Sequence, residues 1–252
     1  MKKLGLIVSA VFVAIVAVST GAAPTTHALN GKAYVGGGTG IYYGAQPTST
    51  TNCTLTALGY DNSNNLVGIT AGHCADNAEA SDPTWANVTA EKDTDAGVVG
   101  TVVYKVFAGH GLGIFSPQPN WNDPANKDYA VILFNKDKVV PQKTVGGVTI
   151  NSVATGSPAL FTQVCKIGRT SGKTCGVVAR VNSPQTFDTQ SMNASGGDSG
   201  SPVVSSNGTL YGAVHGPVFI GFSYGTQSMT MAPMINDINA RGGIGAGFVP
   251  VQ

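Results

Sequence analysis

Short runs of β-branched and apolar residues recur along the chain, and clusters of Gly, Asn, Asp and Pro separate them. This pattern is typical of antiparallel strands joined by turns, and it favours a β-sandwich or a β-barrel. The composition agrees, because charged residues make up only 11% of the sequence and 34 of its 252 residues are glycine. The predicted strands are residues 53–60, 65–71, 97–107, 129–134, 160–167, 174–181, 203–204 and 209–214.

Outside these strands, the sequence predicts one helix and two long loops. The helix spans residues 233–240 and is followed by two glycines, which are favoured just after a helix. Residues 76–96 and 108–127 are long polar stretches, for which we expect surface loops or irregular structure. The apolar pattern is interrupted at residues 136–144, where we place the junction between two halves of the chain.

The first 28 residues are predicted to be a secretory signal peptide. Lys2 and Lys3 form a basic start, an apolar run follows at residues 4–18, and small residues come next. An uncleaved membrane anchor is the alternative, but about 20 apolar residues are normally needed to span a bilayer. We therefore expect a secreted, extracellular protein of residues 29–252 with no stable membrane association after cleavage.

The charge balance excludes some partners. Cleavage after residue 28 removes two of the 14 basic side chains and none of the 13 acidic ones. A mature chain so close to neutrality has no overall reason to bind nucleic acid or anionic lipid. We expect neither of these partners.

Four cysteines, Cys53, Cys74, Cys165 and Cys175, allow three disulfide pairings. Export permits disulfides, and pairing neighbours in sequence, Cys53–Cys74 and Cys165–Cys175, closes two short loops. A structural zinc site is the alternative, but it needs tight C-x-x-C spacing, which is absent. We therefore expect no metal site, and nothing in the sequence calls for a cofactor.

Two segments carry the chemistry. Residues 196–202 read Gly-Gly-Asp-Ser-Gly-Ser-Pro and offer Ser199 on a turn, whereas residues 70–74 read Thr-Ala-Gly-His-Cys and offer the imidazole of His73. Serine is a poor nucleophile at neutral pH unless a base within hydrogen-bond reach takes its proton. The small residues also let the amides of Gly197 and Ser199 point at one spot and hold a developing oxyanion. Together the two segments indicate acyl-transfer chemistry.

A histidine that acts as a base needs its other ring nitrogen oriented, usually by a buried carboxylate. Asp128 is the best candidate, because it stands at the start of the apolar run 129–134, and a strand rooted in the core would hold it rigidly. Asp188 lies in a weakly patterned stretch. Four other aspartates lie in polar, loop-like surroundings, where this side chain is ordinarily solvated: Asp61, Asp76, Asp93 and Asp95.

These motifs resemble the chymotrypsin-like serine proteases in kind and in order. The matching segments are residues 70–74 with His73, residues 128–131 with Asp128, and residues 197–202 with Ser199. The order His, Asp, Ser separates this family from subtilisins and from α/β-hydrolases. Residues 164–172 are similar to the bacterial secreted branch of the family, the streptogrisins. The resemblance covers about residues 30–245.

The resemblance implies an all-β fold of two packed six-stranded antiparallel β-barrels with a short C-terminal helix. We expect the N-terminal barrel at about residues 29–140 and the C-terminal barrel at about residues 141–252. Cys53, ahead of the histidine, matches the family's bridge from that strand to the cysteine after the histidine, which here is Cys74.

The resemblance also implies a role for each matching residue. His73 is the general base and then the general acid, Asp128 orients it, and Ser199 is the nucleophile that is acylated. The amides of Gly197 and Ser199 form the oxyanion hole. The expected protein is a secreted, monomeric serine endopeptidase, with proteins or peptides as its substrates.

Asp198 precedes the nucleophile on the same tight turn. It needs a cation or several hydrogen-bond donors there, because an unpaired buried carboxylate is costly. Bacterial relatives often use an arginine inside the barrel. In this chain Lys166 or Arg169 could serve, in the loop bounded by Cys165 and Cys175.

The specificity pocket is less determined. In the family it is lined by the stretch before the nucleophile and by a strand after it, which makes Asn193, Val214, His215 and Gly216 the candidates. Neither stretch holds an acid, which argues against selectivity for Lys or Arg.

Glutamate-selective bacterial relatives bind the substrate carboxylate with a histidine on this strand. Counted from Gly212, however, His215 stands one place later, where the family commonly has a serine near the aspartate. Side chains alternate along a strand, which would turn His215 away from the pocket. An apolar or broad pocket and a glutamate-selective pocket both stay open.

Two other functions are compatible with the same residues. A catalytically silent binding protein would keep the fold with an unreactive Ser199. A hydrolase of small esters would use the same triad without cleaving proteins. The reactivity of Ser199 and its choice of substrate distinguish these from an endopeptidase.

Overall fold

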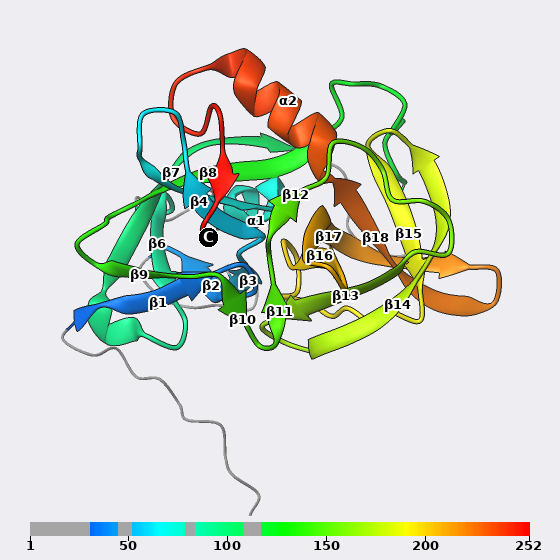
Figure 1. The fold of residues 1–252 in the computed structure, drawn as a ribbon, viewed down its shortest axis with the longest axis horizontal. Helices are drawn as coiled ribbons and strands as arrows, with labels where there is room; N and C mark the ends of the chain where they lie inside the picture. Colours follow the sequence, from blue (N-terminus) through cyan, green and yellow to red (C-terminus); the bar gives the residue numbers. More distant parts are fainter. Residues whose placement is uncertain (1–30, 45–51, 79–83, 108–116) are drawn as a thin grey trace, which may run out of the picture.

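The computed structural model describes residues 31–44, 52–78, 84–107 and 117–252. The predicted signal peptide lies outside the described residues. Figure 1 shows two halves of the molecule side by side, each built mainly from strands, with one helix across the top of the view.

The first half is an eight-stranded antiparallel sheet that curls back on itself. Strands β3 (Asn52–Thr54) and β4 (Ala57–Tyr60) follow one another in the chain, with only Leu55 and Thr56 between them, although they stand near opposite ends of the sheet. In spatial order the strands are β19 (Val249–Pro250), β4 (Ala57–Tyr60), β5 (Leu66–Thr70), β8 (Asp128–Phe134), β7 (Val98–Phe107), β6 (Asn87–Ala90), β2 (Gly40–Tyr43) and β3 (Asn52–Thr54).

The second half is a closed six-stranded barrel, because β17 pairs with both β16 and β18. The order is β17 (Thr209–Ile220), β16 (Pro202–Ser205), β13 (Gln163–Gly168), β14 (Gly172–Ser183), β15 (Thr186–Gln190) and β18 (Ser223–Thr230), and β12 (Ser152–Val153) adds to β17 from outside. The predicted all-β fold of two barrels with a short C-terminal helix is confirmed, although the first sheet has eight strands in place of the predicted six. The chain end returns to the first half, where Val249 lies opposite Tyr60.

The remaining elements connect and cover these sheets. On the first half, β1 (Ala33–Gly36) pairs with β9 (Val139–Gln142), and nearer to the second half β10 (Thr144–Val145) pairs with β11 (Val148–Thr149). The helices are α1 (Gly72–Ala78), the short 3₁₀ helix η2 (Thr94–Ala96) and α2 (Met231–Arg241). The predicted C-terminal helix is therefore present. Among the described residues, no helix is long and apolar enough to cross a bilayer.

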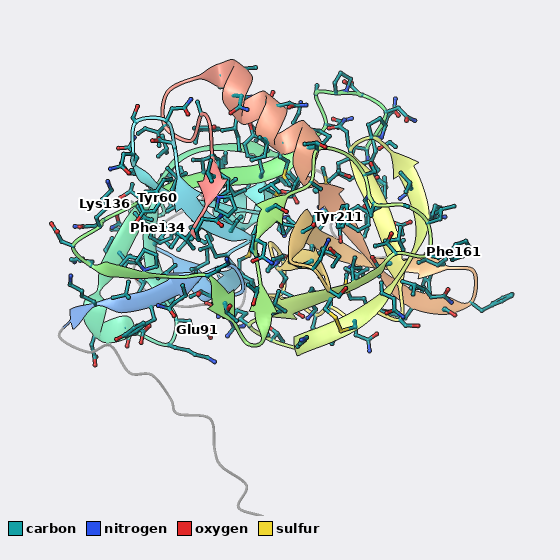
Figure 2. All side chains as sticks on the ribbon, viewed as in Figure 1. Tyr60, Glu91, Phe134, Lys136, Phe161 and Tyr211 are labelled. Atoms are coloured by element: carbon teal, nitrogen blue, oxygen red, sulfur yellow. A yellow bond between two sulfur atoms is a disulfide. The ribbon has the colours of Figure 1, made fainter. Side chains whose placement is uncertain are left out.

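Along a single strand, alternate side chains pack into two different hydrophobic cores. On β8, Ala130 and Ile132 pack inside the first half, whereas Tyr129 and Val131 pack in the layer between the halves. That layer also takes Val67 and Ile69 from β5, and Met231, Met234 and Ile238 from α2. Because both faces of β8 are covered, the strand reads as a continuous apolar run. Figure 2 shows the contrast between Phe134, in the first half, and the exposed Phe161 at the outer side of the second.

The prediction of irregular structure at residues 76–96 is wrong. This stretch contains the end of α1, strand β6 and helix η2. Each element is only three to seven residues long, and such short elements leave little room for an apolar period. Of the second polar stretch, residues 117–127 are described and form turns without a strand or helix.

Candidate active site

His73 and Asp128 meet where α1 and β8 begin side by side. Nδ1 of His73 lies 2.7 Å from Oδ2 of Asp128, and the His73 amide donates to Oδ1 at 2.8 Å. Gly72 allows this approach, because a Cβ there would stand 2.3 Å from the carbonyl oxygen of Val106. Since a carboxylate only accepts hydrogen bonds, Nδ1 of His73 carries the proton and Nε2 is left as a base.

His215 contacts the same carboxylate oxygen. Its Nδ1 lies 2.6 Å from Oδ2 of Asp128, and its side chain is 3% exposed. The side chain of the pocket candidate His215 thus turns toward Asp128, as the strand register indicates. The physical reason is the alternation along β17, which sends Val214 into the barrel core and its neighbour to the other side.

Burial and hydrogen bonding act on Asp128 in opposite directions. Burial raises the pKa of its carboxyl, but the charge and hydrogen bond of His73 and the hydrogen bond of His215 outweigh burial and hold the pKa well below its usual range. Asp128 is therefore an anion at any pH where a neutral imidazole is present.

The three side chains could in principle ligate a metal, since their ligand atoms lie within 4.8 Å of one another. The two nitrogen-to-oxygen distances are 2.7 and 2.6 Å. Around tetrahedral zinc, with bonds near 2.0 Å, neighbouring ligand atoms stand about 3.3 Å apart. The spacing fits shared protons better than a metal. Cys53 and Cys74, which lie near His73, are joined to each other and offer no free thiolate.

Both predicted disulfides form. Cys53 of β3 is bonded to Cys74 of α1, and Cys165 is bonded to Cys175 across the β13–β14 ladder. The first bond ties the helix that carries His73 to the strand that supports the turn around Ser199.

That turn rests on β3 and on the residue pair that follows it. Thr54 donates from its amide to the Ser199 carbonyl at 2.9 Å and from its hydroxyl to the Gly197 carbonyl at 2.9 Å. Thr56 donates from its hydroxyl to the Gly200 carbonyl at 2.6 Å. The half-buried Ser199 is thus held against the strand that leads, through the disulfide, to His73. Sequence reasoning missed Thr54 and Thr56, because two threonines in a strand carry no signal of this role.

The amides of Gly197 and Ser199 donate no hydrogen bond to any described residue. Gly197 has a φ of +93°, a conformation that favours glycine. Two free amides on one turn are the arrangement that can bind an oxyanion. Within the described residues no hydrogen bond joins the Ser199 hydroxyl to His73; such contacts are often long until substrate binds.

Gly200 is the tightest point of the turn. Its φ is +82°, and a Cβ there would stand 2.2 Å from the Thr54 carbonyl oxygen. Because the Thr54 backbone is held in the β2–β3 ladder, a side chain at residue 200 would have to displace the turn. We expect Gly200→Ala to lower the free energy of unfolding by about 1–3 kcal/mol and to impair reaction at Ser199, as measured by urea unfolding and a serine-reactive probe. Gly156→Ala, where nothing lies within 4 Å, is the control; equal effects of both would contradict this account.

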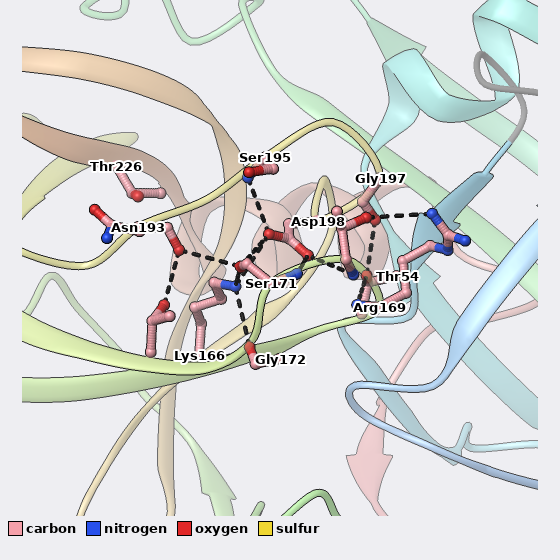
Figure 3. Close-up of polar contacts among 12 residues, drawn as sticks. Thr54, Lys166, Arg169, Ser171, Gly172, Asn193, Ser195, Gly197, Asp198 and Thr226 are labelled. Atoms are coloured by element: carbon pink, nitrogen blue, oxygen red, sulfur yellow. Dashed lines mark hydrogen bonds and ion pairs between the residues drawn. The ribbon is translucent and has the colours of Figure 1, made fainter.

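Asp198 is fully buried and has five hydrogen-bond donors (Figure 3). Nζ of Lys166 lies 3.1 Å from Oδ2, and the amides of Thr170, Ser171 and Ser195 donate at 2.9, 3.1 and 2.9 Å. The Ser171 hydroxyl is the fifth donor. Burial raises the pKa of Asp198, but these hydrogen bonds and the Lys166 charge outweigh it and hold the pKa below its usual range.

Of the two candidate cations, only Lys166 reaches Asp198. Arg169 forms an ion pair with Glu91 instead, with its Nε 2.7 Å from Oε2. That pair joins the second barrel to the first, because Glu91 follows β6. Lys166 points into the barrel from β13 and has no exposed surface, whereas Arg169, on the β13–β14 turn, stays partly exposed.

The other pocket candidates lie close to the turn. Val214 packs with Met192 and Val203 inside the second barrel. Asn193 is exposed, and its carbonyl accepts a hydrogen bond from Thr174 at 2.8 Å. Gly216 is half-buried opposite Gln227 of β18. A separate cavity of 470 Å³ opens beside Cys165 and contains none of these residues.

Three aspartates expected to lie in loop-like or weakly patterned surroundings are buried: Asp61, Asp93 and Asp188. Asp61 accepts from the amides of Ser63, Asn65 and Gly245, and Asp93 accepts from the Tyr34 amide. Asp188 pairs with Arg180. Each carboxylate binds backbone amides or a cation of its own or another segment, a role that polar surroundings in the sequence do not distinguish from solvation.

Stability should fall in acid. The pKa values of Asp61, Asp128, Asp198 and Asp237 are all lowered, because hydrogen bonds and cations outweigh the burial that raises them. A lowered folded-state pKa contributes stability that is full above the unfolded value of about 3.9 and is lost as pH falls below it. Urea unfolding should therefore show a declining midpoint below about pH 4. An unchanged midpoint down to pH 2.5 would contradict it.

No protein-family model matches this sequence, and no curated protein matches it significantly. Solved structures do match. A glutamic acid specific serine protease, described as using a histidine triad in substrate binding, is 20% identical with a TM-score of 0.58 over 81% of this chain and 97% of that chain. Thermobifida fusca Protease A is 21% identical with a TM-score of 0.57 over 87% of this chain and 100% of that chain.

The Nocardiopsis protease is 21% identical with a TM-score of 0.55, over 81% of this chain and 96% of that chain. The fold is chymotrypsin-like. At these identities the likeness establishes the chymotrypsin-like fold alone, so the chemistry of this chain has to be argued from its own site.

Proposed function

We propose that this chain is a secreted, monomeric serine endopeptidase that hydrolyses peptide bonds through an acyl-enzyme. The observation that carries the proposal is the buried couple of His73 and Asp128, with the turn of Ser199 held against the strand that is disulfide-bonded to the helix of His73. The predicted signal peptide and the two disulfides support an extracellular location.

In the proposed reaction His73 first accepts a proton and then donates it, in each of the two steps. The Ser199 hydroxyl attacks the substrate carbonyl carbon while Nε2 of His73 takes its proton, and Asp128 stabilises the imidazolium. The amides of Gly197 and Ser199 bind the oxyanion. His73 then gives the proton to the leaving amine, which breaks the C–N bond and leaves the acyl-enzyme. In the second step, water attacks the acyl carbon while His73 takes its proton. His73 then returns the proton to the Ser199 oxygen, which breaks the ester bond and releases the carboxylic acid.

An apolar or broad pocket is the better-supported specificity. Val214 and Met192 are apolar and buried beside the turn, whereas His215 is engaged with Asp128. A glutamate-binding site built on three histidines, as described for the similar protease, would need three besides His73. The chain has four histidines, but two of them bind Asp128 and His27 lies in the predicted signal peptide, which leaves two too few.

A fluorophosphonate probe tests the proposal directly, because it labels only an activated serine. The mature chain should be labelled, and Ser199→Ala and His73→Ala should not. Labelling with cleavage of casein would support an endopeptidase, and labelling with hydrolysis of short esters alone would point to an esterase. A folded wild-type chain that is not labelled would indicate a silent binding protein and overturn the proposal.

A further inference from the structure

The carboxylate of Asp128 has two imidazole donors. Both His73 and His215 approach the single oxygen Oδ2, and the His73 amide occupies Oδ1. Both rings must carry a proton on Nδ1, since the carboxylate can only accept. The proposed reaction uses only one of these imidazoles, which leaves a buried titratable group with no assigned role.

We propose that His215 is a positioning residue of this site, which holds Asp128 through Oδ2 and thereby sets the pH range in which His73 is a free base. The inference rests on the proposed function for its kinetic consequence, but not for its effect on the proton affinity of His73.

The surroundings hold His215 in place. The indole of Trp121 packs edge-on against its ring at 5.3 Å between centroids, and the ring of His73 lies at 5.6 Å and at 90° to it. His215 is 3% exposed and Asp128 is 1% exposed, so water competes little for their hydrogen bond.

Other ionisable groups in this region are few. Tyr43 of β2 acts electrostatically on Asp128, and burial raises the pKa of its phenol, so it stays neutral. Lys105 of β7 lies 2.9 Å from Asp76 of α1, and Phe107 adds an uncharged ring 5.8 Å from His73. His215 is thus the ionisable neighbour that shares the Asp128 oxygen with His73.

The two donors compete for one oxygen. A hydrogen bond from His215 draws negative charge from Oδ2, so Asp128 stabilises a protonated His73 less than it would alone. If His215 is itself protonated, its charge repels a proton on His73 and acts in the same direction. Removing the donor should therefore raise the pKa of His73, and a larger fraction of His73 would be protonated and inactive near pH 6.

The test compares His215→Leu, which has no donor, with His215→Asn, which keeps an N–H. The control is Thr189→Val, which removes a buried hydroxyl of the same barrel that has no hydrogen-bond partner in the part of the chain that the structure describes. The acid limb of kcat/KM on a peptide substrate should move to higher pH by about half to one unit in His215→Leu. It should move less in His215→Asn and not at all in the control. Loss of positioning should also lower kcat about 10- to 100-fold in His215→Leu.

A second readout does not need activity. The pKa of His73 can be followed by NMR with ¹⁵N-labelled histidine, and it should rise in His215→Leu even if the wild type proves not to be a peptidase. If His215→Leu does not fold, His215→Val, with a residue suited to strands, takes its place. The same pKa of His73 in the wild type and in a folded variant without the donor would overturn the inference. An equal rise in His215→Leu and His215→Asn, or an equal shift in Thr189→Val, would also overturn it.

Discussion

Replacing Ser199 with alanine is expected to lower kcat on a peptide substrate by about 10⁴–10⁶-fold while the protein stays folded. The alanine removes the only atom that can attack, whereas the carbonyl that binds Thr54 and the amide of the oxyanion hole belong to the backbone and remain. His73→Ala should cause a loss of similar size, because the serine then keeps its proton. Combining both substitutions should add little, since the two residues act as a unit.

The measurement is hydrolysis of a chromogenic peptide by purified variants, with near-ultraviolet circular dichroism to confirm folding. Ser206→Ala is the matched control, because Ser206 lies exposed at the β16–β17 turn, away from the site. Its kcat should equal that of the wild type. A loss below tenfold in a folded Ser199→Ala would remove the assignment of Ser199 as the nucleophile.

The chemistry-bearing part of the site could be predicted from the sequence, because local geometry demands rare residue types there. A turn with positive φ and close backbone approaches requires the glycines around Ser199. A carboxylate at the start of a fully apolar strand is fixed by the core, and this selected Asp128 among the other acids. The same reasoning could not find Thr54 and Thr56, whose role arises only when β3 and the turn meet in space.

Two strands of the second barrel were not predicted, and their composition explains why. Strand β15 reads Thr-Phe-Asp-Thr-Gln and β18 reads Ser-Tyr-Gly-Thr-Gln-Ser-Met-Thr, yet most of their residues are buried. The burial of Thr186, Thr189, Thr226 and Ser228 inside the second half produces no alternation of apolar and polar residues. A method based on hydrophobic period therefore reads such strands as loops.

His215 marks the limit of reasoning by strand register. Counting from Gly212 predicted that this side chain turns away from the pocket, and the structure agrees. What a count along one strand cannot provide is the partner, because Asp128 comes from the other half of the molecule. Contacts between the two halves, such as this one, are therefore what a register count along one strand does not provide.

Replacing Lys166 with methionine is expected to lower the free energy of unfolding by about 3–5 kcal/mol, because it leaves Asp198 buried without its cation. Neither side chain of the pair has any exposed surface, so water cannot take over. Asp198 also receives the Ser195 amide, so its displacement should move the segment 195–199. We expect kcat to fall about 10²–10³-fold, the loss typical of one missing oxyanion donor.

Lys173→Met separates this effect from the loss of any lysine, because Lys173 is exposed on the neighbouring strand and, among the described residues, binds only the Gly147 carbonyl. Its stability and kcat should stay near wild type. Adding Asp198→Asn to Lys166→Met should restore part of the stability, because the uncompensated charge is then gone. If Lys166→Met were as stable and active as Lys173→Met, the four remaining donors would suffice for Asp198. The lysine would then not be what holds the oxyanion turn in place.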